Sequence, residues 1–116
     1  MEQTKRDVWI AYTQDTRADH TTTAMCDVRA FDNQESAANY AQDMLESNQE
    51  FWRGQGCKAT GIYGSLHFRN QAYFFYNEPH RRNRSVCKAT VQKIDLYNFW
   101  HKDGFAEFMQ KGYKNI

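Results

Sequence analysis

Residues 32–56 read DNQESAANYAQDMLESNQEFWRGQG and predict a long amphipathic helix. Asp32 or Asn33 can cap its start, and Asp32 with Glu35 has the spacing of a capping box. Two glycines provide a stop at its end, Gly54 and Gly56. The apolar side chains fall on one stripe of this helix, which consists of Ala37, Ala41, Met44, Leu45 and Trp52. Such a stripe needs an apolar surface to cover.

Stretches of alternating sequence on both sides of the helix can provide that surface. Period-two alternation predicts strands at residues 8–12, 22–31, 59–68, 71–76 and 85–96. The first two predict an antiparallel pair, and the link Arg69-Asn70 is short enough for a tight hairpin. The consecutive rings from Tyr73 to Tyr76 must face both sides of a sheet, which predicts a central strand. We also expect a bulge near Ile94.

The order of these elements defines the fold class. Residues 98–111 predict a second helix, so the order is strand, strand, helix, strand, strand, strand, helix. Links of hairpin length and the lack of repeated crossover helices indicate an α+β domain with a mostly antiparallel sheet of about five strands. The long helix is expected on one face of this sheet. A chain of 116 residues suits one such domain, spanning residues 1–116.

The composition excludes several classes of protein. Leu, Ile, Val and Phe make up 19 of the 116 residues, about 16%, which is low enough to raise the question of disorder. A net charge of +1 and 18 aromatic residues argue against disorder, because each ring buries a large area. No apolar run approaches the roughly 18 residues of a transmembrane helix, and the short apolar stretch at residues 8–12 does not suit a signal peptide. We therefore expect a cytoplasmic protein.

Metal, cofactor and disulfide motifs are missing from the sequence. Cys26, Cys57 and Cys87 form no CxxC pair and are expected to be reduced and mostly buried, with a Cys57–Cys87 bridge as the alternative. The four histidines show no pair at metal-ligand spacing, and no phosphate-binding glycine loop or dinucleotide motif occurs. The sequence therefore predicts no metal and no cofactor.

The small net charge hides an asymmetry between the two halves of the chain. Residues 1–50 carry four basic and ten acidic side chains, a net charge of −6. Residues 51–116 carry eleven basic and four acidic side chains, a net charge of +7. Either the halves interleave in one sheet and partly neutralise each other, or the molecule has an acidic face and a basic loop.

The basic residues of the second half define a candidate binding site for a macromolecule. The predicted arginines offer charge-assisted contacts, and aromatics near the sheet edge offer an apolar anchor. The candidate residues are His80, Arg81, Arg82, Arg84, Lys88, Tyr73 and Tyr76.

We expect a non-catalytic binding module, and first a stoichiometric inhibitor or modulator of a protein partner, because the aromatic content exceeds what one small core needs. In style rather than in any motif, the chain resembles inhibitors encoded by phages and mobile elements, anti-CRISPR proteins among them. An aromatic-rich edge strand would also permit a homodimer.

Two alternatives stay open. The first is an RNA- or DNA-binding domain that uses residues 80–93, since arginines clamp phosphates and tyrosines stack on bases. The second is a small ribonuclease-like enzyme in which Glu78, His80 and the adjacent arginines act as base, acid and phosphate stabiliser.

Overall fold

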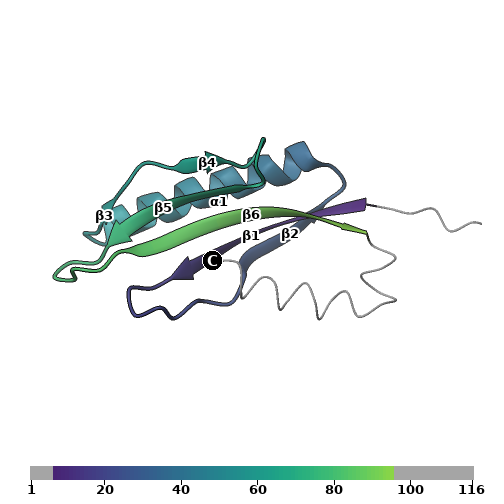
Figure 1. Cartoon of the computed structure of the whole chain (residues 1–116). Coiled ribbons are helices and arrows are strands. Elements are labelled where there is room, and N and C mark those ends of the chain that lie inside the picture. The colour runs from purple at the N-terminus through teal and green to yellow at the C-terminus, as the bar shows by residue number, and fades with distance from the viewer. Residues whose placement is uncertain (1–6, 96–116) are drawn as a thin grey trace, which may run out of the picture.

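The computed structural model describes residues 7–95, which form a six-stranded antiparallel sheet with one long helix packed on one of its faces (Figure 1). The elements are β1 (Asp7–Thr16), β2 (Cys26–Phe31), α1 (Gln34–Gly54), β3 (Lys58–Ala59), β4 (Tyr63–Ser65), β5 (Gln71–Asn77) and β6 (Ser85–Asp95). The strand order is β2-β1-β6-β5-β3, and β4 pairs with β5. The α+β fold predicted from the sequence is confirmed. The helix predicted at residues 98–111 lies outside the described residues.

Helix α1 begins and ends close to the positions that the sequence indicates. The side chain of Asn33 caps the helix and accepts a hydrogen bond from the backbone N–H of Ser36 at 2.8 Å. The expected capping box of Asp32 and Glu35 is wrong, because the cap lies one residue further along the chain. After the helix, Gly56 adopts a positive φ of 86°, as expected for a stop. The buried residues of α1 are Ala37, Ala38, Ala41 and Leu45, and their small size lets the helix lie close to the sheet.

The core lies between α1 and the sheet, and the alternation along the strands decides which side chains enter it. In β5, Phe74 and Tyr76 are fully buried, whereas Tyr73 and Phe75 are half-buried and lie on the opposite face. We call the face of the sheet opposite α1 the distal face. Strand β5 pairs with β6 on one side and with β3 and β4 on the other, so its predicted central position is confirmed.

The segment before β5 differs from the single strand predicted at residues 59–68. It forms the two short strands β3 and β4, because the Thr60 hydroxyl accepts a hydrogen bond from the Phe75 N–H at 3.0 Å where a ladder carbonyl would otherwise do so. At Gly64, φ is +86° and a Cβ atom would lie 2.7 Å from the Gln71 carbonyl oxygen, so glycine is required there. The link between β4 and β5 spans residues 66–70 and is longer than the expected hairpin.

The irregularity of the sheet lies in the β1–β2 pair and not near Ile94. Strand β6 pairs with β1 without a shift of register, whereas the β1–β2 register shifts between Ala11 and Thr13. Asp27 adopts a positive φ of 57° at this point, and its carboxylate accepts a hydrogen bond from the Thr13 hydroxyl at 3.2 Å. The predicted strand at residues 22–31 is correspondingly shorter and begins at Cys26.

The three cysteines are free. Cys57 and Cys87 are buried as expected and form no bridge, whereas Cys26 is exposed.

Candidate binding surface

Residues 78–84 connect β5 to β6 and form the basic loop, which contains three of the predicted arginines. The Arg81 N–H donates to the Glu78 carbonyl at 3.2 Å, and the Asn77 amide donates to the carbonyls of Arg82 and Asn83. These bonds close the loop on itself with its backbone polar groups turned inward. The arginine side chains are left exposed.

Glu78 anchors the basic loop to the neighbouring strand. Its carboxylate lies 3.1 Å from Arg17 Nη1 and 3.5 Å from Arg81 Nε. Arg17 follows the end of β1, so the two ion pairs tie the loop to β1 and partly neutralise Arg81. No hydrogen bond or ion pair joins Glu78 to His80 within residues 7–95. The acid–base arrangement of the ribonuclease hypothesis is therefore not assembled here.

Arg17 also holds an aromatic stack on the α1 side of the sheet. Its guanidinium lies 5.2 Å from the centre of the Trp52 ring and donates a hydrogen bond to the Tyr76 hydroxyl at 3.4 Å. The Trp52 and Tyr76 rings stack, with centroids 4.5 Å apart. Burial raises the pKa of Tyr76 to about 12. We call Arg17, Trp52, Tyr76 and Glu78 the Arg17 brace; because Tyr76 is 0% exposed, its ring is not available to a partner.

Three aromatic rings form a continuous surface on the distal face, which we call the aromatic platform: Tyr63, Tyr73 and Phe75. Tyr63 stacks on Tyr73 with centroids 5.7 Å apart, and the Phe75 ring lies 5.5 Å from Tyr73 and 6.1 Å from Tyr63. Tyr63 pairs with Tyr73 across the β4–β5 ladder and is 50% exposed. The platform thus presents aromatic area to solvent at the sheet edge.

Arg84 connects the platform to the basic loop. Its guanidinium lies 4.3 Å from the centre of the Phe75 ring, within cation–π distance. Within residues 7–95, neither Arg82 nor Arg84 forms an ion pair. Beside this contact the surface is hollowed over about 440 Å³, and the lining residues are Thr16, Arg17, Ala18, His20, Phe75, Asn83, Arg84 and Val86.

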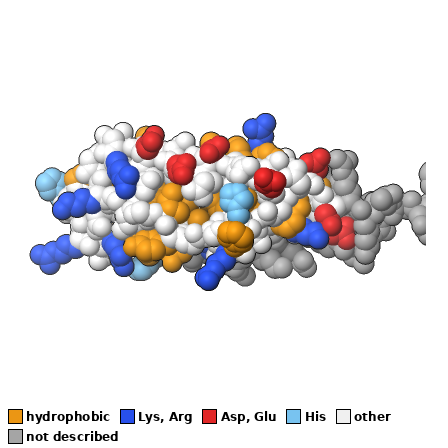
Figure 2. Space-filling view, turned by 90° about the horizontal axis from the view of Figure 1, so that it is seen from above, with side chains coloured by type: hydrophobic (Ala, Val, Ile, Leu, Met, Phe, Trp, Pro, Cys, Tyr) orange, Lys and Arg blue, Asp and Glu red, His pale blue; other side chains and the backbone are white. Residues whose placement is uncertain are grey.

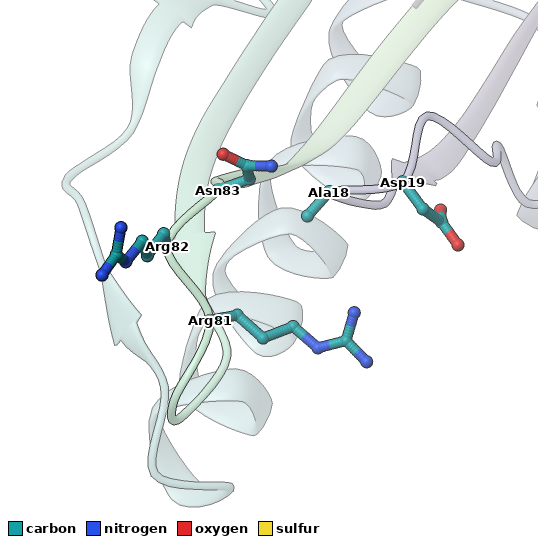
Figure 3. Close-up of a pocket in the computed structure, with 5 residues that line it drawn as sticks. All are labelled: Ala18, Asp19, Arg81, Arg82 and Asn83. Carbon is teal, nitrogen blue, oxygen red and sulfur yellow. The ribbon is translucent and has the colours of Figure 1, made fainter.

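A second hollow lies between the basic loop and the β1–β2 loop (Figure 3). Its volume is about 340 Å³, and it is lined by Ala18, Asp19, Arg81, Arg82 and Asn83. Figure 3 shows that the Arg81 side chain extends toward the side of Asp19, while Arg82 points the opposite way. Hydrogen bonds from Thr21 lower the pKa of Asp19, and Arg81 adds to this effect. Arg82 is thus the loop arginine turned away from described carboxylates.

The distal face carries no carboxylate at the strand positions of β1, β5 and β6. In these three strands the residues that alternate with the core are 8, 10, 12, 14 and 16, then 71, 73, 75 and 77, then 86, 88, 90, 92 and 94. Lys88 is the charged residue among them, and it lies opposite Tyr73 in the ladder. Burial lowers the pKa of Lys88.

Acidic side chains instead follow the outer surface of α1. Glu35, Asp43, Glu46 and Glu50 are all exposed there, and they form no salt bridge within the described part of the chain. Figure 2, which looks onto the α1 side, shows acidic side chains along the body of the molecule and basic side chains gathered at one end. The charges predicted from the two halves of the sequence are therefore segregated on the surface.

The predicted site residues thus divide into two groups. The structure brings together the basic loop, Lys88 and Tyr73 at one end of the sheet, and it places Tyr76 in the core. Strand alternation separates residues 73 and 76, because positions three apart face opposite sides. The same rule would have selected Phe75 in place of Tyr76. Tyr63 could not be selected, since its position depends on the β4–β5 register.

Comparison with known proteins finds no relative: no protein-family model, curated protein or solved structure matches the chain. Between residues 7 and 95, no helix is long and apolar enough to cross a membrane. In the same part of the chain, no group of three or more His, Cys, Asp or Glu residues is placed to hold a metal ion. A functional argument must therefore start from the surface described above.

Proposed function

We propose that this chain is a non-catalytic module that binds an anionic macromolecule with fixed stoichiometry. The binding surface consists of the basic loop, Arg84 and the aromatic platform. The observation that carries the proposal is the position of Arg82 and Arg84, which are exposed and without an ion pair in residues 7–95, beside the half-exposed ring of Tyr63.

The residue types at this surface support binding. Arginine and tyrosine are over-represented among the residues that contribute most to macromolecular interfaces. An arginine fork binds carboxylate or phosphate oxygens in a bidentate manner and contributes more than a neutral hydrogen bond. Carboxylate on a protein and phosphate on a nucleic acid are therefore the two partner chemistries that this surface suits. An inhibitor of a protein partner is one form of the proposal.

Steering by charge also supports an anionic partner. The acidic surface of α1 and the basic end of the sheet give the molecule a charge separation despite its net charge of +1. Such a field orients an anionic partner toward the basic end and raises its association rate at low ionic strength. A catalytic role receives no comparable support, because the Glu78 carboxylate is already bound by two arginines.

The test compares two charge reversals at opposite ends of β5. Arg82→Glu/Arg84→Glu alters the proposed surface, and Arg69→Glu is the matched control, since the Arg69 side chain is exposed and forms no ion pair in residues 7–95. Each tagged protein is incubated with extract of the native host, with and without nuclease. We expect a partner that binds the wild type and Arg69→Glu in a defined ratio, and that binds the double variant at least about tenfold more weakly.

Melting temperatures of the three proteins serve as the folding control and should be nearly equal, because the altered side chains are exposed. Retention of the same partner with the same affinity by all three proteins contradicts the proposal. Loss of the partner after nuclease treatment identifies a nucleic acid, and its persistence identifies a protein.

A further inference from the structure

We infer that the partner is a single-stranded nucleic acid, whose bases stack on the aromatic platform while its phosphates bind Arg84 and the basic loop. This inference rests on the proposed function and assigns a chemical class to the partner. Four features of the surface lead to it: the geometry of the rings, the position of Arg84, the distribution of carboxylates and the rigidity of the edge.

The rings have the arrangement that exposed bases require. Tyr63 and Tyr73 are stacked with an angle of 26° between their planes, and half of Tyr63 is exposed at the edge of the sheet. Every base has a π face, so an exposed ring can extend such a stack whatever the sequence of the strand. Bases in a duplex are already paired and stacked, which favours a single strand over a double helix.

Arg84 lies where a phosphate would follow a stacked base. Its contact with Phe75 at 4.3 Å fixes the guanidinium beside the platform, and the absence of an ion pair in the described chain leaves its N–H groups for a phosphate. Arg82 points away from described carboxylates and extends the positive surface along the loop. A backbone that leaves the platform toward the loop would meet both arginines in turn.

The distribution of carboxylates distinguishes this face from the rest of the molecule. Strands β1, β5 and β6 carry no Asp or Glu at their distal positions, whereas the outer surface of α1 has four exposed carboxylates. A polyanion that runs over the distal face therefore avoids repulsion along these strands. An acidic peptide would use the same charges, but it has no need of a stacked pair of tyrosines.

The edge that carries Tyr63 is held rigidly, so binding requires little ordering of the protein. Gly64 permits the close approach of β4 to β5, and two hydrogen bonds join Thr60 to the backbone of Phe75. From the other side, Gln49 and Arg53 of α1 donate hydrogen bonds to the carbonyls of Thr60 and Ala59. A preorganised platform loses less conformational entropy on binding.

Fluorescence anisotropy with defined probes tests the inference. The full chain is titrated into labelled oligo(dT) and oligo(U) of about twenty nucleotides, a duplex of the same length, and labelled poly-L-glutamate, at low and moderate salt. We expect both single strands to bind more tightly than the duplex and than poly-L-glutamate. The affinity for single strands should fall steeply as salt rises.

Two pairs of variants separate stacking from charge. Tyr63→Ala should weaken binding to oligo(dT) about tenfold, while Tyr63→Phe retains a stacking ring and should restore most of the affinity. Phe51→Ala is the matched control, because Phe51 is 56% exposed on α1 and away from the platform. Arg84→Ala should weaken binding about tenfold, and Arg69→Ala should leave it unchanged.

The outcomes distinguish failure of this inference from failure of the proposed function. Binding of poly-L-glutamate that is lost in Arg82→Glu/Arg84→Glu, without binding of single strands, overturns the nucleic-acid inference and leaves the binding module intact. Single-strand binding that ignores Tyr63→Ala also overturns it, since stacking is then not used. If no anionic probe and no extract partner binds, both proposals fail.

Discussion

Two arginines lie over aromatic rings on opposite faces of β5, and they differ in how far their charge is satisfied. Arg17 contacts Trp52 on the α1 side, donates to Tyr76 and pairs with Glu78. Arg84 contacts Phe75 on the distal side and has no ion pair within residues 7–95. Adjacent residues of one strand thus support two different uses of the same side-chain chemistry.

The difference teaches which arginine is structural and which is available. Arg17 has its guanidinium bound by a carboxylate and a hydroxyl, so a new partner would have to displace bonds that already exist. Arg84 is positioned by a ring, which leaves its hydrogen-bonding groups for a ligand. Residue type alone therefore says little about a binding role; the number of partners already present in the fold says more.

The largest expected effect comes from truncating one ring on each side of β5. Trp52→Ala removes a ring that stacks on the buried Tyr76 and should lower the free energy of unfolding by about 3 kcal/mol. Phe75→Ala removes a half-buried ring from the distal face and should cost about 1 kcal/mol. Urea denaturation measures both, and equal losses would show that the two faces are not different in kind.

Strand alternation explains how much of this contrast was visible in the sequence. The stripe of α1 and the run of rings in β5 were sufficient to predict a helix-covered antiparallel sheet, because both depend on local periodicity. The same periodicity separates Phe75 from Tyr76, so the face of each ring in β5 could be predicted once the strand was identified. Grouping Tyr76 with the basic loop ignored this rule.

The remaining parts of the surface depend on pairing between distant segments. Tyr63 reaches the platform through its pairing with Tyr73, and Arg17 reaches Glu78 across 61 positions of the chain. No local pattern reports such contacts, since register and loop closure are set by the whole sheet. The irregular segment at Thr60 was missed for the same reason: its hydroxyl replaces a ladder partner that lies on another strand.

A smaller effect separates the two arginines themselves. Arg17→Ala leaves the Tyr76 hydroxyl without its donor and Glu78 with one ion pair fewer, so the free energy of unfolding should fall by about 1–2 kcal/mol. Arg84→Ala removes a contact at the surface and should change stability by less than about 0.5 kcal/mol.

Thermal and urea unfolding of both variants measure this difference. Binding to the anionic probes should show the reverse order: Arg84→Ala weakens it, and Arg17→Ala leaves it closer to the wild type. Two variants with equal losses of stability would break the distinction between a structural and an available arginine.

The smallest expected effect concerns Asp15, a carboxylate beside the Arg17 brace whose Oδ1 atom is buried without a hydrogen-bond partner. Burial raises the pKa of Asp15 above its ordinary value of 3.8, against the opposing influence of Cys87 and Arg17. A raised pKa means that the folded state holds the proton more tightly than the unfolded state. The associated stability is therefore present below about pH 3.8 and is lost as the pH rises through the raised pKa.

Replacing Asp15 with a neutral residue should remove this dependence. Asp15→Asn should raise the free energy of unfolding at pH 7 by up to about 1 kcal/mol, and the gain should shrink as the pH falls toward 4. Asp19→Asn is the control of opposite sign, because the pKa of that exposed carboxyl is lowered and its ionised form favours folding. Urea unfolding across this pH range distinguishes the two variants. A loss of stability in Asp15→Asn at every pH would mean that the carboxylate, like Glu78, serves the Arg17 brace chiefly through its charge, and the contrast between a fully satisfied brace and an unsatisfied surface would then extend to the acidic partners as well.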